Sequence, residues 1–209
     1  MRNRHFFLTS ILVALIISSC TNKSSKSKEI YLEDTIPGSV VVQMYEDSTP
    51  ALVQIFKVDA NGNPTYEMVR EVQYYKSHKP YIDCSYSTVM TDSNILTLRD
   101  GPAFAYFENG NVQTEAFYIK GKENGDYNIY YENGKPMVEG HYDLGLRTGE
   151  WKFYYENGNL RKKGSFENDV CVGKWVDYNE KGKIYKEMET DENTIGCGIC
   201  PKCVKISSK

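Results

Sequence analysis

A repeat of 24 residues constrains the fold of this chain more than any other feature of its sequence. Four ten-residue segments align at this spacing without gaps, and each ends in a glycine: 101–110, 125–134, 149–158 and 173–182. A fixed period of this length is typical of supersecondary units that stack on one another, because one unit alone cannot bury its apolar face. The chain is therefore expected to form an array of similar units.

Each repeat is expected to form one β-hairpin. Asn-Gly pairs end three of the four segments, and Asn-Gly between alternating residues is a strong hairpin signal because both turn positions favour positive φ. Residues Trp151 to Glu156 alternate with the period of a strand. A Gly-containing loop then leads to the next repeat. The sequence therefore predicts an all-β fold, an elongated antiparallel meander of 24-residue β-hairpins.

The repeat motif resembles that of a known family. Gly149-Glu150-Trp151 is followed by Tyr154-Tyr155-Glu156-Asn157-Gly158 and then by Gly164-Ser165-Phe166. This pattern resembles the MORN repeat, and more closely the bacterial MORN variant of the YwqK-type antitoxin repeat family, over residues 101–188. The resemblance implies a hairpin array that acts as a scaffold or membrane-proximal organiser. The family name leaves open an antitoxin or immunity-type partner binder.

Residues 1–19 have the features of a secretory leader. Arg2 and Arg4 precede an apolar run over residues 6–17. This run is too short for a transmembrane helix, which needs about 20 apolar residues, and it suits the apolar region of a signal peptide. Ile17-Ser18-Ser19-Cys20 then resembles the lipobox of bacterial lipoproteins. The resemblance implies cleavage before Cys20 and acylation of that residue. An ordinary secretory signal with a chance cysteine is the alternative.

The residues after the leader indicate a tethered protein. Residues 20–29 are rich in Ser and Lys and predict a flexible tether, because such a stretch cannot bury apolar surface. Acyl chains such as palmitate on Cys20 would hold the chain in a membrane lipid layer. Thr21 does not resemble the Asp that retains some lipoproteins in the inner membrane, which favours the outer membrane. We therefore expect a membrane-anchored lipoprotein of the bacterial cell envelope.

The region of residues 30–100 is less regular than the repeats that follow it. It is rich in β-forming residues, and the segment from Tyr74 to Pro80 is similar to the segment from Tyr130 to Pro136 in the repeats. Terminal repeats of an array are often atypical because they cap it. We therefore interpret this region as degenerate repeats that extend the same sheet. A small separate β domain is the alternative.

The C-terminal segment, residues 189–209, lies outside the repeat frame. It carries Cys197, Cys200 and Cys203 at two overlapping Cys-x-x-Cys spacings. In an oxidising compartment the simplest outcome is a disulfide. A zinc site is the second interpretation, but closed zinc sites use four ligands, so Cys84 or Cys171 would have to complete it. A redox role is the third, although no strand-to-helix context accompanies the motif.

Composition and motifs argue against several classes of function. The net charge of −3 lacks the basic excess of nucleic-acid binders. No catalytic or cofactor-binding motif is found, and His78 and His141 lie far apart in the sequence, so we expect neither enzymatic activity nor a cofactor. The aromatic columns are the candidate binding face for a protein partner, with a packed sheet face as the alternative. The candidate residues are Tyr127, Trp151, Trp175, Tyr130, Tyr154 and Tyr178.

Overall fold

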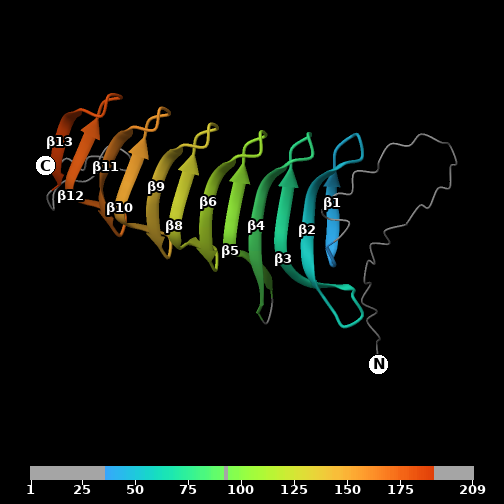
Figure 1. Cartoon of the computed structure of the whole chain (residues 1–209). Coiled ribbons are helices and arrows are strands. Elements are labelled where there is room, and N and C mark those ends of the chain that lie inside the picture. The colour runs from blue at the N-terminus through green and yellow to red at the C-terminus, as the bar shows by residue number, and fades with distance from the viewer. Residues whose placement is uncertain (1–35, 92–93, 191–209) are drawn as a thin grey trace, which may run out of the picture. The chain divides into compact units, whose positions relative to one another are not determined.

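The computed structural model describes residues 36–91 and 94–190. Over these residues the chain is all-β, without helices, and forms one 13-stranded antiparallel sheet (Figure 1). The predicted fold class is therefore confirmed. The predicted leader and tether, Cys20, and the tail cysteines Cys197, Cys200 and Cys203 lie outside the described residues.

The strands follow one another in the sheet in chain order, as in a meander. The short strand β7 stands apart from this path and pairs with β6 inside the connection from β6 to β8. Each strand is therefore paired with its neighbours in sequence. The bounds are β1 (Ser39–Met44), β2 (Pro50–Val58), β3 (Pro64–Tyr74), β4 (Pro80–Met90), β5 (Ile95–Tyr106), β6 (Val112–Ile119), β7 (Lys122–Glu123), β8 (Gly125–Tyr130), β9 (Pro136–Asp143), β10 (Leu146–Tyr154), β11 (Leu160–Glu167), β12 (Val170–Tyr178) and β13 (Ile184–Thr190).

The less regular region of the sequence contributes strands β1 to β4 and the first half of β5 to this same sheet. The backbone position of the turn glycines is taken there by Ser48 and His78, which have positive φ values of 67° and 63°. Successive turns are further apart than 24 residues in this region, because strands β3, β4 and β5 are longer than the strands of the regular repeats. The hairpin array therefore continues through it with longer arms.

The connections between strands alternate between two edges of the sheet (Figure 1). We call the upper edge in Figure 1 the turn edge; its connections are 45–49, 75–79, 107–111, 131–135, 155–159 and 179–183. We call the lower edge the loop edge; its connections are 59–63, 91–94, 120–124, 144–145 and 168–169.

The Asn-Gly turns do not adopt the expected two-residue geometry. Gly158 has a positive φ of 92°, but Asn157 does not. The Gly158 N–H donates to the Tyr155 carbonyl and the Tyr155 N–H to the Asn159 carbonyl, both at 2.8 Å. This pattern corresponds to a type I turn followed by a left-handed glycine. The Asn157 side chain stabilises this form: its Oδ1 accepts the Asn159 N–H at 2.8 Å, and its Nδ2 donates to the Glu180 carbonyl at 3.2 Å.

Turns with two left-handed residues occur instead on the loop edge. Lys120-Gly121, Leu144-Gly145 and Asn168-Asp169 have positive φ at both positions. The residues that flank each pair are cross-strand partners, as Asp143 and Leu146 are, which corresponds to the two-residue hairpin of type I′. The expectation that both residues of the Asn-Gly turns take positive φ is therefore wrong, and sequence reasoning missed the loop edge as the place of such turns.

A cluster of buried side chains lies in the C-terminal repeats. It consists of Trp151, Phe153, Phe166, Cys171 and Trp175, each at most 7% exposed. Both Trp rings lie against glycines of the preceding strand. A Cβ atom on Gly140 would come within 2.3 Å of the Trp151 ring, and one on Gly164 within 2.0 Å of the Trp175 ring. Any side chain at these glycines would collide with the indole, so the close packing requires glycine.

A ladder of tyrosine hydroxyls connects successive hairpins along the turn edge. The hydroxyls of Tyr131 and Tyr155 donate to the carbonyls of Tyr154 and Tyr178, at 2.7 and 2.8 Å. Tyr45 and Tyr75 make equivalent bonds in the less regular repeats. Phe107 takes the corresponding position one repeat before Tyr131 and has no hydroxyl to donate. Except at Phe107, a tyrosine therefore bonds each hairpin to the next in addition to the pairing within the sheet.

Candidate binding surface

The structure divides the aromatic candidates between the two faces of the sheet. Trp151 packs with Tyr127 and Tyr142 in the core cluster, on what we call the aromatic face. Tyr154 lies on the opposite face, because its hydroxyl contacts Glu139, the cross-strand partner of Lys152. The same alternation puts Tyr130 opposite Tyr127, and Tyr178 recurs at the repeat position of Tyr154. The six residues do not form one surface.

The aromatic face is filled by its own rings. Successive rings meet edge to face, with centroids 5.2 Å apart for Tyr142 and Trp151, 5.8 Å for Trp151 and Phe166, and 5.1 Å for Phe166 and Trp175. Such geometry stabilises aromatic pairs beyond the area they bury. Trp151 is 4% exposed and Trp175 is 1% exposed, so neither ring is available to a partner without opening the core. Burial also raises the pKa of Tyr142 to about 12.

The opposite face carries three half-buried tyrosines at the repeat spacing, Tyr130, Tyr154 and Tyr178, and the first two pair with Glu115 and Glu139. We call these five residues the tyrosine row. The Tyr130 hydroxyl donates to Glu115 Oε2 at 3.0 Å, and the Tyr154 hydroxyl donates to Glu139 Oε2 at 2.5 Å. Burial and the neighbouring Glu139 raise the pKa of Tyr154. The hydroxyls of Tyr130 and Tyr154 are therefore held in place as protonated hydrogen-bond donors.

The same spacing separates successive members of the tyrosine row. Each step passes from one hairpin to the next, across two strands. Neighbouring strands lie about 4.8 Å apart, so equivalent tyrosines recur about every 10 Å. The row therefore repeats a tyrosine ring and hydroxyl at a regular interval along a line.

Charged groups beside the row are paired within the sheet. Lys152 Nζ lies 3.0 Å from Glu150 Oε2, and His141 Nδ1 lies 2.9 Å from Asp126 Oδ1. Exposed pairs of this kind contribute little to stability, typically about 0–1 kcal/mol. His78 lies in the connection from β3 to β4, so strands β5, β6 and β8 separate it from His141 on β9. The structure does not bring the two histidines together.

The two cysteines within the described strands differ in state. Cys84 is a buried free thiol, and burial raises its pKa. Cys171 is disulfide-bonded, so its sulfur is not available as a metal ligand in this state. Among the residues that the structure describes, no group of three or more His, Cys, Asp and Glu side chains is arranged to hold a metal ion. The described part of the chain also has no helix long and apolar enough to cross a bilayer.

A comparison with protein families divides the chain into the same repeating units as the hairpins. The profile of the MORN repeat variant family matches three consecutive segments, residues 99–120, 123–144 and 147–168. The chain contains MORN repeats. Each matched repeat has its Asn-Gly turn near the middle and ends at a two-residue turn of the loop edge. Strands β12 and β13 continue the MORN geometry beyond the last match. No curated protein matches the chain.

Two residues that matter for this MORN array were missed by sequence reasoning. Gly140 and Gly164 hold the Trp rings, and they recur at the repeat spacing of 24 residues. Ala116 is the equivalent residue one repeat earlier, opposite the smaller ring of Tyr127. The signal was present as a column of small residues that follows the spacing of the aromatic column.

Proposed function

We propose that this protein is a bacterial lipoprotein of the YwqK-type MORN variant, anchored through acylated Cys20, with a non-enzymatic binding or scaffolding role at the cell envelope. The observation that carries the binding role is the tyrosine row, which repeats one polar and aromatic group at a fixed interval on the face opposite the core. The lipobox-like sequence Ile17 to Cys20 supports the anchor. The outer membrane is favoured over the inner membrane because Thr21 stands where some inner-membrane lipoproteins carry a retaining Asp.

The partner that fits this surface is a protein with an extended contact segment. Tyr is favoured in protein interfaces because it provides a large rigid ring and a polar tip at low conformational cost. The hydrogen bonds from Tyr130 to Glu115 and from Tyr154 to Glu139 fix the rings before a partner arrives. Preorganised groups lose less freedom on binding, which favours affinity.

A scaffolding role is also supported by the distribution of titratable groups. An enzyme would need an acid or base near a nucleophile. His141 contacts Asp126 and lies apart from His78, and the raised pKa of Tyr154 makes its phenolate scarce at neutral pH. These arrangements favour recognition over acid–base chemistry.

Two experiments test the proposal. Membrane fractionation of cells that express a Cys20→Ala variant is expected to move the protein to the soluble fraction, and unchanged fractionation would refute the anchor. Crosslinking in intact cells, followed by identification of the captured protein, tests the binding surface. A Tyr130→Ala/Tyr154→Ala variant is expected to lose the crosslinked partner. A Tyr66→Ala/Tyr185→Ala variant, which removes exposed tyrosines outside the row, is the matched control and is expected to keep it.

A further inference from the structure

Two arginines occupy equivalent places on the aromatic face but differ in their partners. Arg99 and Arg147 are separated by two repeat lengths. The guanidinium carbon of Arg99 lies 5.4 Å from the centre of the Tyr118 ring. The guanidinium carbon of Arg147 lies 4.1 Å from the centre of the Phe166 ring. In both cases the ring belongs to the following strand, and a cation above an aromatic ring is attracted by it. The fold therefore holds the two arginines in the same way.

The carboxylate that neutralises Arg147 has no counterpart at Arg99. Asp169 Oδ1 accepts a hydrogen bond from Arg147 Nε at 2.6 Å, and the Asp169 N–H donates to the Arg147 carbonyl at 3.1 Å. The Gly121 N–H donates to the Arg99 carbonyl at 2.7 Å, so Gly121 takes the place of Asp169 but offers no carboxylate. Among the residues that the structure describes, none forms an ion pair with Arg99.

Two tyrosines accompany the Arg99 side chain. Tyr86 is the cross-strand partner of Arg99, and a hydrogen bond from the guanidinium to the Tyr86 side chain raises the pKa of Arg99. Tyr118 contributes a second side-chain hydrogen bond with the same effect on that pKa. Both tyrosines are half-buried, whereas Arg99 is exposed. A phenol oxygen that accepts a hydrogen bond keeps its own proton to donate, so both hydroxyls and the guanidinium have donors left for an anion.

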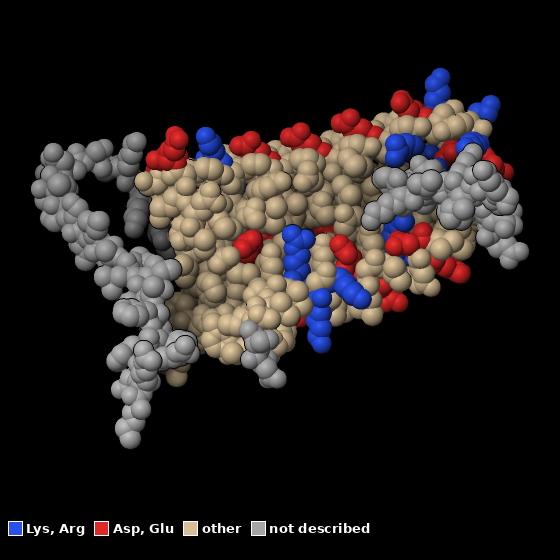
Figure 2. Space-filling view, turned by 180° about the vertical axis from the view of Figure 1, so that it is seen from behind, with Lys and Arg blue, Asp and Glu red and all other residues tan. Residues whose placement is uncertain are grey.

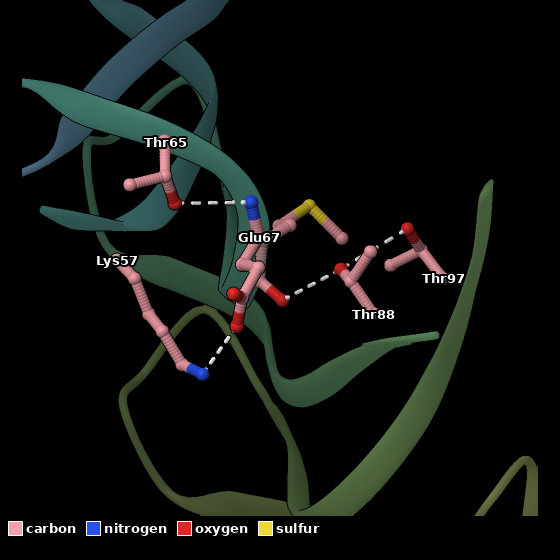
Figure 3. A network of polar contacts seen from close by, with 6 residues as sticks. Lys57, Thr65, Glu67, Thr88 and Thr97 are labelled. Carbon is pink, nitrogen blue, oxygen red and sulfur yellow. Dashed lines mark hydrogen bonds and ion pairs between the residues drawn. The ribbon is translucent and has the colours of Figure 1, made fainter. Parts of the chain in front are cut away.

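The strands that carry Tyr86 and Arg99 are fixed beside this pair. Thr88 and Thr97 are cross-strand partners two positions away along β4 and β5, and their hydroxyls lie 3.5 Å apart (Figure 3). The Thr88 hydroxyl also donates to the Met68 carbonyl of β3 at 3.3 Å. These contacts join three neighbouring strands. The arginine and the tyrosine are therefore presented from a hydrogen-bonded base, and such preorganised groups lose less freedom when they bind.

The carboxylates of the neighbouring strands have other partners or lie beyond another strand. Glu67 pairs with Lys57 in the network of Figure 3. Glu71 accepts hydrogen bonds from two glutamine amides, at 2.8 and 3.3 Å. Glu123 is the cross-strand partner of Tyr118, so strand β6 separates it from the arginine on β5. The positive charge of the arginine is therefore left for a group from outside the chain.

The recurring acidic residues of the chain lie at the other edge of the sheet. Figure 2 shows acidic side chains at intervals along the upper rim of the molecule, where the turn edge lies. The recurring residues of that edge are Glu108, Glu132, Glu156 and Glu180. Glu108 is nine residues from Arg99 along the chain, which is about 30 Å in an extended strand, and salt screens exposed charges over more than about 10 Å. Lys120 and Lys122 flank Gly121, are exposed and add positive charge.

We propose that Arg99, Tyr86 and Tyr118 bind a carboxylate side chain of a protein partner. The chain itself shows that this group fits, because the Asp169 carboxylate occupies the same place beside Arg147. A guanidinium can bind a carboxylate through two parallel N–H···O bonds. An acidic segment of a partner would supply at Arg99 what Asp169 supplies within the chain. The site lies on the face opposite the tyrosine row and does not depend on it.

Nuclear magnetic resonance of the full chain, labelled with ¹⁵N-arginine, tests the site. The probe is the acetylated peptide amide Gly-Ser-Asp-Ser-Gly, and the same peptide with Asn in place of Asp is its control. We expect the Asp peptide to shift the Nε–H signal of Arg99 saturably and the Asn peptide to bind at least about tenfold more weakly. The signals of Arg70 and Arg147, which are paired with carboxylates, should stay in place. The absence of a saturable shift, or an equal shift of the exposed Arg161, would overturn the proposal.

A variant that supplies the missing carboxylate gives an independent test. Gly121→Asp reproduces the residue at Asp169, and the backbone allows it, because φ is 84° at Gly121 and 69° at Asp169. A Cβ at Gly121 would meet only the Leu98 side chain, at 3.7 Å. The new carboxylate is expected to occupy Arg99 and to weaken binding of the Asp peptide at least about tenfold.

The matched control is Gly121→Asn, which makes the same backbone demand without the charge and is expected to bind the peptide as the wild type does. An unchanged Arg147 signal in both variants would report an intact fold. Equal peptide affinity of Gly121→Asp and Gly121→Asn would overturn the proposal, because the added carboxylate would then not compete for the Arg99 guanidinium.

Discussion

Restoring the missing rung of the tyrosine ladder is expected to stabilise the array. Phe107 is half-buried at the position where Tyr131 and Tyr155 donate to the next hairpin. The change Phe107→Tyr adds one hydroxyl at that position, within reach of the Tyr130 carbonyl by the repeat geometry. The donor-to-acceptor distances of 2.7 and 2.8 Å in the neighbouring repeats define the bond that should form. The substitution conserves the ring, so the packing is expected to stay the same.

The size of the effect follows from the net value of one hydrogen bond. A typical intramolecular hydrogen bond contributes about 0.5–1.5 kcal/mol after exchange with water. We therefore expect Phe107→Tyr to raise the free energy of unfolding by about 1 kcal/mol. For a chain of this size that corresponds to a rise in Tm of roughly 2–4 °C. Urea unfolding followed by circular dichroism, together with a thermal scan, measures both quantities.

The reverse change provides the matched control. Tyr131→Phe removes the bond to the Tyr154 carbonyl and is expected to lower the free energy of unfolding by about 1 kcal/mol. If Tyr131→Phe destabilises the protein as expected while Phe107→Tyr gives no gain, the hydroxyl at residue 107 does not reach its acceptor. The inference that every repeat shares one ladder geometry would then be wrong.

Three further changes test the backbone, the core and the titration of the tyrosines. Ser48→Gly is expected to raise the free energy of unfolding in urea by about 0.5–1 kcal/mol, because Ser48 has a φ of 67° at the turn-glycine position. A loss of stability would show that this backbone conformation does not destabilise the wild type. Gly164→Ala is expected to lower the free energy of unfolding by about 3 kcal/mol, because its Cβ would lie within 2.0 Å of the Trp175 ring. The control Gly182→Ala, with open space around its Cβ, should lower it by about 1 kcal/mol through its positive φ alone. Tyr142 has its pKa raised from 10.0 to about 12, so its unfolded form ionises first and stability should fall as the pH rises from about 10 to 12. Circular dichroism and the difference in tyrosinate absorbance between the wild type and Tyr142→Phe would check this. A difference that appears near pH 10 without loss of structure would refute it.

The features of the fold that depend on the period could be predicted from the sequence. The hairpins, the antiparallel meander and the all-β class follow from spacing and alternation, and the structure confirms that class. The turn type could not be predicted from Asn157-Gly158 alone, because the Asn157 side chain bonds to the Glu180 carbonyl of the next hairpin. That bond is a contact between repeats, whereas the turn rule considers only local backbone preference.

The candidate site was predicted less completely than the fold. The aromatic columns were recognised, but spacing alone does not say which face of a strand is buried. The contrast between Trp151, which is buried against Gly140, and Tyr154, which contacts Glu139, depends on cross-strand neighbours.

The directional packing between hairpins has a consequence for how such a chain changes length during evolution. Two successive hairpins provide a glycine for the Trp of the hairpin that follows, Gly140 for Trp151 and Gly164 for Trp175. The same hairpins also provide a tyrosine donor, Tyr131 for the carbonyl of Tyr154 and Tyr155 for that of Tyr178. A duplicated 24-residue segment would therefore arrive with a matching surface at both ends. Duplication or deletion of such segments could lengthen or shorten the protein by whole hairpins without compensating mutations elsewhere.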